Sequence, residues 1–356
     1  MTEAWINRIG TAVPMHDMHA DFVQFGRTLL PDERSRALFD RMAGLSEIAH
    51  RYAIFAPGPM PRTEALDAEG FYRRGAFPST AQRMARFQAP ALDLAQTAVD
   101  RLDLGPGERA RITHLIVASC TGFAAPGLDF RLMRAAGLPE TVERTMIGFM
   151  GCFAAVNGLR LARHIVRSEA GARVLVVNLE LCSLHLQEQW ELARMLSFLL
   201  FGDGASAALV TADPEGLALG TFRTEVVPRT DGLITWDVGD SGFEMHLSGQ
   251  VPNQIRGFAR AKGTELLRAL DVPEPAHWAL HAGGRTVLDA VQEGFGLRPE
   301  ALRHSRAVLR EFGNMSSATL MFVLSHILAG PPAPGLGVAM AFGPGLTVES
   351  FAFRAA

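Results

Sequence analysis

Residues 143–168 read ERTMIGFMGCFAAVNGLRLARHIVRS, and the pattern of this stretch decides the fold class. The short apolar run MIGFM ends a strand that we predict over Glu143–Met150. From Phe153 to Ser168 the apolar residues recur at helical spacing, which predicts a helix. Gly151 permits a sharp turn between the two elements, so Cys152 is expected at the helix start. A strand that turns directly into a helix is typical of α/β proteins.

The same alternation of strands and helices runs along the whole chain. Further strands are predicted over Arg111–Cys120, Ala172–Glu180, Gly204–Thr211, Trp278–His281, Gly337–Phe342 and Leu346–Phe353. Further helices are predicted over Ile255–Leu270, Gly284–Phe295, Pro299–Phe312 and Met315–Ala329. The polar segment Thr211–Leu219 carries Pro and Gly and indicates a boundary between two lobes of similar strand–helix order. We therefore predict an α/β protein with an N-terminal lobe over 1–211 and a C-terminal lobe over 212–356.

Composition and charge argue against several functional classes. The chain has 356 residues, of which 48% are hydrophobic and 20% charged, as in ordinary globular proteins. A formal net charge of -3 provides no basic field to attract nucleic acid. No apolar run approaches the roughly 18 residues of a membrane-spanning helix, and the N-terminus lacks the pattern of a secretory signal. We expect a cytoplasmic protein without membrane insertion and without a nucleic-acid partner.

The three cysteines, Cys120, Cys152 and Cys182, lack the number and spacing of a disulfide framework or a zinc site, so reduced thiols are expected. Cys152 is a candidate nucleophile, because a helix N-terminus carries partial positive charge and free N–H groups that stabilise a thiolate. Its pKa is therefore expected below the ordinary value of about 8.5. The alternative interpretation is a small cysteine buried in the core.

His281 and Asn314 also stand at predicted turns. His281 ends a strand before a Gly-Gly pair, where α/β enzymes display catalytic groups, although a satisfied core histidine is the alternative. Asn314 fits a helix cap, but its carboxamide can also donate a hydrogen bond to a developing oxyanion. A thiol that holds an acyl thioester, with two donors that stabilise an enolate, predicts decarboxylative acyl condensation. Papain-like proteases share the residue order but do not place the cysteine after a buried strand.

Five segments carry a resemblance to a known family: GFMGCFAAVNGLRLA around Cys152, LFGDGASAALV from Leu200, WALHAGGRTVLDAV around His281, GNMSS around Asn314, and FGPGLTVE from Phe342. Together they are similar to the type III polyketide synthases, the chalcone synthase-like branch of the thiolase superfamily. The resemblance covers essentially the full length. It implies a homodimer of five-layered αβαβα subunits that condense an acyl-CoA starter with malonyl-CoA, without a metal, an organic cofactor or a carrier-protein domain.

The resemblance also assigns roles to individual positions. Cys152 matches the family's nucleophile, and His281 and Asn314 match the pair that promotes decarboxylation. Phe201 matches the gatekeeper phenylalanine between the substrate tunnel and the cavity, although a phenylalanine beside a glycine turn fits the core equally well. Further positions match the family's cavity walls and floor: Ser316, Gly343 and Pro344.

The positions that bind coenzyme A depart from the plant members of the family. Plant enzymes carry three basic side chains in a helix near residue 40, whereas this chain keeps Arg41 and has Leu38 and Leu45 at the other two places. Weaker phosphate binding is therefore expected. Either other basic residues such as Arg51 assist, or the starter arrives on another carrier, such as an acyl carrier protein.

Departures inside the cavity are typical of a bacterial synthase. Met245 replaces a second gate aromatic, and its flexible thioether can admit longer acyl groups. Cys120 stands in place of a threonine, and Trp236 fills a place that is small in many plant members. The expected apolar lining comprises Met245, Ala124, Ala125 and Leu184. These features favour a medium- or long-chain fatty acyl starter, extended by malonyl units into an alkylresorcinol or alkylpyrone.

Two alternative functions remain for the same residues. A β-ketoacyl carrier-protein synthase of the type that starts fatty acid synthesis shares the fold and a Cys-His-Asn set, but performs a single condensation. A non-catalytic acyl-binding protein is the other alternative, and it would not need all three reactive residues. The Phe201 turn and the Phe-Gly-Pro-Gly segment favour the polyketide branch.

Overall fold

A nine-stranded sheet runs through the molecule in the computed structural model, which describes residues 2–60, 63–191, 195, 197–330 and 334–355. The strand order is β11-β12-β13-β8-β1-β7-β6-β4-β5. The N-terminal strands are β1 (Ala4–Ala12), β4 (His114–Ser119), β5 (Glu143–Gly148), β6 (Val174–Leu181) and β7 (Asp203–Thr211). The C-terminal strands are β8 (Leu217–Val226), β11 (His277–Leu280), β12 (Gly335–Gly343) and β13 (Thr347–Ala355). The antiparallel pairing of β1 with β8 joins the two halves.

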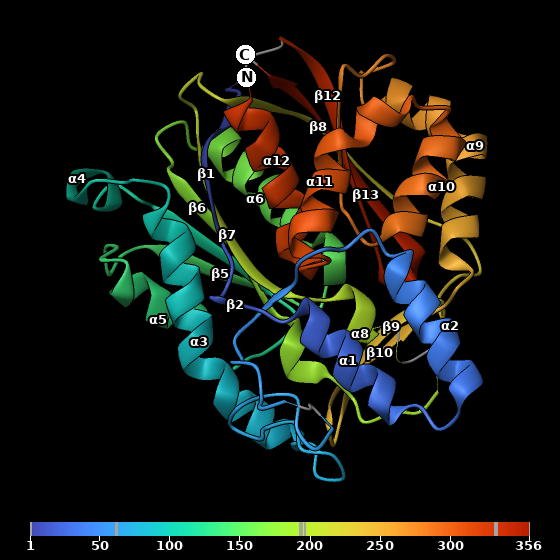
Figure 1. Cartoon of the computed structure of the whole chain (residues 1–356). Coiled ribbons are helices and arrows are strands. Elements are labelled where there is room, and N and C mark those ends of the chain that lie inside the picture. Colours follow the sequence, from blue (N-terminus) through green and yellow to red (C-terminus); the bar gives the residue numbers. More distant parts are fainter. Residues whose placement is uncertain (1, 61–62, 192–194, 196, 331–333, 356) are drawn as a thin grey trace.

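Helices and sheet halves alternate in five layers (Figure 1). Helices α3 (Thr80–Asp100) and α5 (Leu128–Ala135) cover the outer face of the N-terminal half. Helices α6 (Ala154–Ser168) and α12 (Thr319–Ala329) lie between the halves, because both join a core cluster that draws on strands from each. Helices α9 (Val251–Ala269) and α10 (Arg285–Phe295) cover the outer face of the C-terminal half. The order αβαβα is the one that the resemblance implies.

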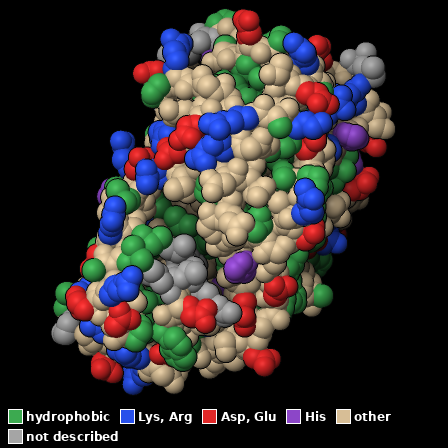
Figure 2. Space-filling view, turned by 90° about the vertical axis from the view of Figure 1, so that its right-hand side faces the viewer, with side chains coloured by type: hydrophobic (Ala, Val, Ile, Leu, Met, Phe, Trp, Pro, Cys, Tyr) green, Lys and Arg blue, Asp and Glu red, His purple; other side chains and the backbone are tan. Residues whose placement is uncertain are grey.

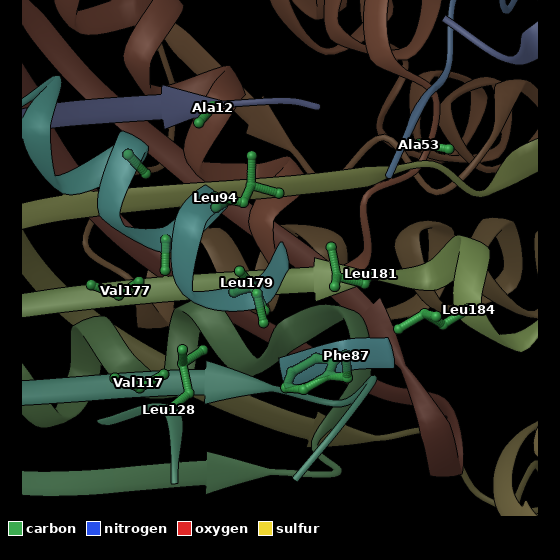
Figure 3. Packing of buried hydrophobic residues seen from close by; sticks show 14 of the residues in the cluster. Ala12, Ala53, Phe87, Leu94, Val117, Leu128, Val177, Leu179, Leu181 and Leu184 are labelled. Atoms are coloured by element: carbon green, nitrogen blue, oxygen red, sulfur yellow. The ribbon is translucent and has the colours of Figure 1, made fainter. Parts of the chain in front are cut away.

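Successive side chains of a strand point to opposite faces of the sheet, so one strand contributes to the core on both of its sides. Successive residues of β6 point to opposite faces of the sheet, so Val177 joins the cluster beneath α3 and Val176 joins the cluster beneath α6. Figure 3 shows Val177 and Val117 on adjacent strands, and Leu94 and Phe87 of α3 belong to the same cluster. Every residue of β6 is buried, which explains why apolar residues dominate both faces of this strand.

Smaller elements surround this frame and build the walls of the cavities described below. Two short sheets pair β2 (His16–Asp17) with β3 (Tyr52–Ala53) and β9 (Ile234–Gly239) with β10 (Gly242–Leu247). The described part of the chain also contains helices α1 (His19–Leu29), α2 (Glu33–Gly44), α4 (Pro106–Arg109), α8 (Ser197–Leu200) and α11 (Arg303–Phe312). Within the described ranges, no helix has both the length and the apolar composition that crossing a membrane requires.

All of the predicted elements are present, with ends shifted by a few residues. The helix predicted from Pro299 begins as a 3₁₀ turn over Pro299–Leu302, and the helix predicted from Met315 begins at Thr319 after another such turn. The strand predicted over 143–150 is β5, which lies at the edge of the sheet with mostly exposed side chains. Strands β1, β8, β9 and β10 were not predicted, because polar residues or a mixture of exposed and half-buried residues interrupt the apolar run in each.

Candidate active site

Cys152 lies in the sharp turn between β5 and α6, as the sequence predicts. It is the middle residue of a 3₁₀ turn over Gly151–Phe153 that leads directly into α6. Gly151 has a φ of +74°, and a Cβ added there would come within 2.6 Å of Pro344 Cδ. Only glycine combines this conformation with so close an approach. The backbone N–H of Gly151 also donates to Cys120 Sγ over 3.1 Å, which brings a second thiol beside the turn.

The expected low pKa of the Cys152 thiol is wrong. Burial raises the pKa of Cys152 to about 12, and the buried Glu180 adds to this rise. The hydroxyl of Ser316, whose Oγ lies 3.8 Å from Cys152 Sγ, acts in the opposite direction. Desolvation of the thiolate therefore outweighs the hydrogen bond from Ser316. The resting thiol is neutral and needs a base to take up its proton.

His281 follows β11 at the carboxyl end of that strand and is 2% exposed. Its backbone N–H donates to Met340 O over 2.8 Å, which continues the strand pairing. Both ring nitrogens are buried and have no hydrogen-bond partner in the described part of the chain. Burial lowers the pKa of His281 to about 4, so the imidazole is neutral at physiological pH. A neutral imidazole with two free nitrogens can accept one proton and donate another.

Asn314 forms the cap that its sequence context suggests, and its amide nitrogen is held toward the segment that follows His281. Its Oδ1 accepts the backbone N–H of Ser316 over 2.8 Å, which caps the turn before α12. Its Nδ2 donates to Gly283 O over 3.2 Å, and Gly283 N in turn donates to His281 O over 2.9 Å. Through Ser316 the same residue reaches Cys152. A continuous series of contacts thus joins the predicted nucleophile to the carboxamide of Asn314 and to the backbone of His281, although the three residues come from separate parts of the chain.

A cavity of about 310 Å³ lies against Cys152. The predicted residues that line it are Cys120, Cys152, Phe201, Trp236, Met245, Ser316 and Pro344. Gly343 lies just behind this wall, where a Cβ would come within 2.6 Å of the Phe153 ring. In the described part of the chain, no group of three or more His, Cys, Asp or Glu side chains is placed to hold a metal ion.

The expected apolar lining needs correction. Ala124 lines a separate cavity beside Phe123 and Phe149, Leu184 is fully buried in the core, and Ala125 is not among the residues that border the cavity at Cys152. Polar side chains contribute to that cavity, and they include Gln187, Gln189, Asp237, Glu244 and His246. The reason is the unpredicted β9–β10 hairpin, whose exposed polar residues form part of the rim.

The hairpin is held against the nucleophile by contacts that sequence reasoning missed. Trp236 Nε1–H donates to Cys120 O over 2.7 Å. His185 bonds through Nε2 to Thr121 O over 2.7 Å, and its Nδ1 accepts the backbone N–H of Phe243 over 3.0 Å. Its ring stacks on Phe243 with centroids 4.2 Å apart. These contacts join segments that are far apart in the chain, so no local sequence pattern predicts them.

A second cavity, of about 380 Å³, opens on the other side of Phe201. Met42 and Leu45 line its α2 side, and Leu200 and Gly283 line its inner side. Leu200 borders this cavity and its neighbour Phe201 borders the first, so the peptide between these two residues lies between the two spaces.

The basic residues near the second cavity differ in their exposure. Arg41 is exposed in the last turn of α2, close in sequence to the lining residues Met42 and Leu45. Arg51 is fully buried, so the suggestion that it assists in binding phosphates is wrong. The face that carries α2, α9 and α10 bears positive and negative side chains interspersed with one another (Figure 2).

Comparisons with known proteins identify the family. Residues 2–214 match the family model for the N-terminal domain of chalcone and stilbene synthases, and residues 219–356 match that for the C-terminal domain. The C-terminal type III polyketide synthase domain of Steely1, a type I/III hybrid from Dictyostelium, is 25% identical with a TM-score of 0.90, and the match covers 99% of both chains. PKS-I from the brown alga Ectocarpus siliculosus is 28% identical with a TM-score of 0.87, over 100% of this chain and 99% of that one.

A third structure, CsyB complexed with CoA-SH, shares the fold with a TM-score of 0.84 at 22% identity, over 99% of this chain and 100% of CsyB. The five layers, the full-length overlaps and the two family matches agree with one another. The match to both synthase domains also sets aside the fatty-acid-initiation enzyme and the non-catalytic acyl-binding protein. The chain therefore belongs to the chalcone and stilbene synthase family and is a type III polyketide synthase, an acyltransferase with the α/β thiolase-like fold.

Proposed function

We propose that this synthase loads an acyl starter on Cys152 and extends it with malonyl units that lose carbon dioxide beside His281 and Asn314. The observation that carries the proposal is the series of contacts from Cys152 through Ser316 and Asn314 to the peptide of His281. Cys152 and Ser316 line the first cavity and Gly283 lines the second, so the proposal places one substrate thioester beside this series.

Loading begins from a neutral thiol, because burial holds the pKa of Cys152 at about 12. The imidazole of His281 takes the thiol proton as Sγ attacks the carbonyl carbon of the starter thioester. The bond from Sγ to the acyl carbon forms, the bond from that carbon to the carrier sulfur breaks, and the carrier thiolate takes up the proton. Both ring nitrogens of His281 are free for these transfers in the described part of the chain.

Extension uses the same site with a second thioester. The carbonyl oxygen of malonyl-CoA accepts hydrogen bonds from Asn314 Nδ2 and from the His281 ring, so the charge that develops on it as carbon dioxide leaves is stabilised. The resulting enolate carbon attacks the acyl carbon on Cys152, and the thiolate departs. Asn314 suits this work because Ser316 and Gly283 already fix its carboxamide.

Substrates enter, in this proposal, through the cavity bordered by α2. Its lining by Met42, Leu45 and Leu200 suits the slender arm of coenzyme A, and CsyB, a protein of the same fold, holds CoA-SH. Arg41 is the basic residue that we assign to the phosphates. An acyl carrier protein is the second donor that we consider, because two of the three basic positions found in plant enzymes are leucines here.

The starter that we favour is a fatty acyl group, converted to an alkylresorcinol or alkylpyrone by a bacterial-type synthase. Apolar side chains near the nucleophile support it, among them Phe201, Met245 and Ile234, while Glu244 and His246 lie at the exposed rim. A volume of about 310 Å³ is at the lower end of the range for ligand pockets, roughly 300–1,000 Å³. We therefore place the starter at the medium-length end of the proposed range.

A homodimer and a division into lobes 1–211 and 212–356 complete the proposal. Strand β5 lies at the sheet edge, and Met146, Phe149 and Met150 near it are 40%, 41% and 39% exposed. An edge strand flanked by exposed apolar side chains is suited to pairing with a second copy.

The deciding experiment offers acyl-CoAs of graded chain length, aromatic acyl-CoAs and malonyl-CoA alone, and measures product masses. We expect products that contain one medium-length acyl group and several malonyl-derived units. Activity confined to aromatic starters or to malonyl-CoA alone would remove the fatty acyl proposal. Products with a single added unit would contradict iterative extension. The same panel on acyl carrier protein thioesters separates the two donors.

A further inference from the structure

Arg51 is a fully buried cation bonded to the backbone of Phe201, a residue that lines the cavity at Cys152. It immediately precedes β3, and its guanidinium lies 4.8 Å from the centroid of the Phe22 ring. Nη1–H donates to the backbone oxygen of Phe201 over 3.1 Å, and Nε–H donates to His19 Nδ1 over 2.9 Å. The fork of the guanidinium therefore connects helix α1 to the backbone of Phe201.

The stem of Arg51 occupies a slot between two glycines. A Cβ at Gly313, whose φ is +68°, would come within 2.7 Å of Arg51 Cγ. A Cβ at Gly202 would lie 3.5 Å from Arg51 Cβ. These glycines adjoin Phe201 and Asn314, which form a parallel bridge. The side chain thus supports both strands of that bridge at once.

The bridge is closed by two backbone hydrogen bonds. Gly202 N donates to Asn314 O over 3.0 Å, and Asn314 N donates to Leu200 O over 2.8 Å. A shift of the Phe201 peptide would therefore move the backbone of Asn314 with it. The side chain of Asn314 would move away from its contacts with Ser316 and Gly283.

The charge of Arg51 is not explained by an ion pair. The carboxylate of Asp17 accepts the backbone N–H of Arg51 and bonds to the ring of His50, but no carboxylate bond to the guanidinium is found in the described chain. Nη2 is buried without a partner there. A buried, incompletely paired cation costs stability. The presence of Arg51 at this place is better explained by its contacts with the backbone around Phe201 and Asn314.

We propose that Arg51 is a positioning residue that fixes the Phe201–Asn314 bridge, so that the Asn314 carboxamide stays aimed at the malonyl thioester. The inference rests on the role proposed above for Asn314. Arginine is needed because its planar fork reaches the Phe201 oxygen and the His19 nitrogen together. A lysine ammonium at the end of a flexible stem keeps the charge but satisfies one of the two acceptors.

The test compares two half-reactions of the full-length enzyme. Loading of Cys152 by an acyl-CoA is followed by intact-protein mass, and decarboxylation of malonyl-CoA is followed by release of carbon dioxide. For Arg51→Met we expect the kcat of decarboxylation to fall about 100-fold, the effect of an ångström-scale misplacement, with KM and the loading rate changed by about 3-fold at most. Arg51→Lys should lie between this variant and the wild type.

A second pair of variants keeps the inference falsifiable if Arg51→Met does not fold. Gly313→Ala strains the backbone and presses on Arg51, whereas Gly296→Ala imposes the same strain at a φ of +65° with no atom within 4 Å of the new Cβ. We expect Gly313→Ala, but not Gly296→Ala, to lower decarboxylation relative to loading. Equal ratios in these variants and the wild type would overturn the role of Arg51. A wild type that fails to load or to decarboxylate would instead overturn the proposed function.

Discussion

Replacement of Gly151 by alanine tests how closely the nucleophile turn fits the cavity floor. The backbone there has a φ of +74°, and the new Cβ would come 2.6 Å from Pro344 Cδ and 3.2 Å from Pro344 Cγ. The left-handed conformation costs a non-glycine residue about 1–2 kcal/mol. Because a proline ring cannot rotate away, overpacking adds about 1–3 kcal/mol. We expect a loss of about 2–5 kcal/mol in the free energy of unfolding.

Gly137→Ala provides the matched control. Its φ is +64° and no atom lies within 4 Å of the added Cβ, so the conformational part of the cost remains and the clash does not. Urea unfolding of both variants should therefore differ by about 1–3 kcal/mol, and only Gly151→Ala should slow acylation of Cys152. Equal losses of stability in the two variants, with equal acylation rates, would refute the claim that Pro344 packs on the nucleophile turn.

Three further predictions concern single contacts of the site. Ser316→Ala removes the hydroxyl that lowers the pKa of Cys152. Acyl loading at pH 7 should therefore slow by about 3- to 10-fold, which corresponds to the free energy of one ordinary hydrogen bond. A loading rate that is the same in this variant and the wild type between pH 7 and 9 would argue against that contact. Burial raises the pKa of Glu180 from its ordinary value of 4.5 to about 7. Between these values the folded protein binds more protons than the unfolded chain, so Glu180 makes stability fall as pH rises through this window. Glu180→Gln cannot titrate, so this variant should gain stability relative to the wild type between pH 5 and pH 8 in thermal melts, and parallel curves would contradict the raised pKa. Trp236→Phe removes the N–H that donates to Cys120 O, so the cavity wall should loosen and product masses should shift toward longer starters. An unchanged product profile would show that Trp236 has no role in selecting the starter.

Local pattern was sufficient for the nucleophile turn. In residues 143–168 a short apolar run, a glycine and an amphipathic helix follow one another. Each of these features can be recognised directly in the sequence. The order of the strands in the sheet is a different matter, because β1 pairs with β7 and β8, which lie some two hundred residues away along the chain. The family resemblance implied the five layers, but the order of the strands was not predicted.

The electrostatics of the site could not be predicted from the same pattern. The position of Cys152 at a helix start is visible in the sequence, but its enclosure is not, and enclosure decides the direction of the pKa shift. Arg51 shows the same limit, since a basic residue beside a histidine and a tyrosine suggests a surface position. Its burial beneath Phe201 depends on contacts with α1 and with the peptide at Gly313.

The most direct test of the central claim is peptide mapping of the wild-type enzyme after a short reaction with a medium-chain acyl-CoA. Cys120, Cys152 and Cys182 all border the cavity, so they form an internal control. We predict the acyl mass on the peptide that carries Cys152, and its loss in Cys152→Ala. An adduct on Cys120 or Cys182 in the wild type, or product formation by Cys152→Ala, would contradict the assignment of Cys152 as the nucleophile.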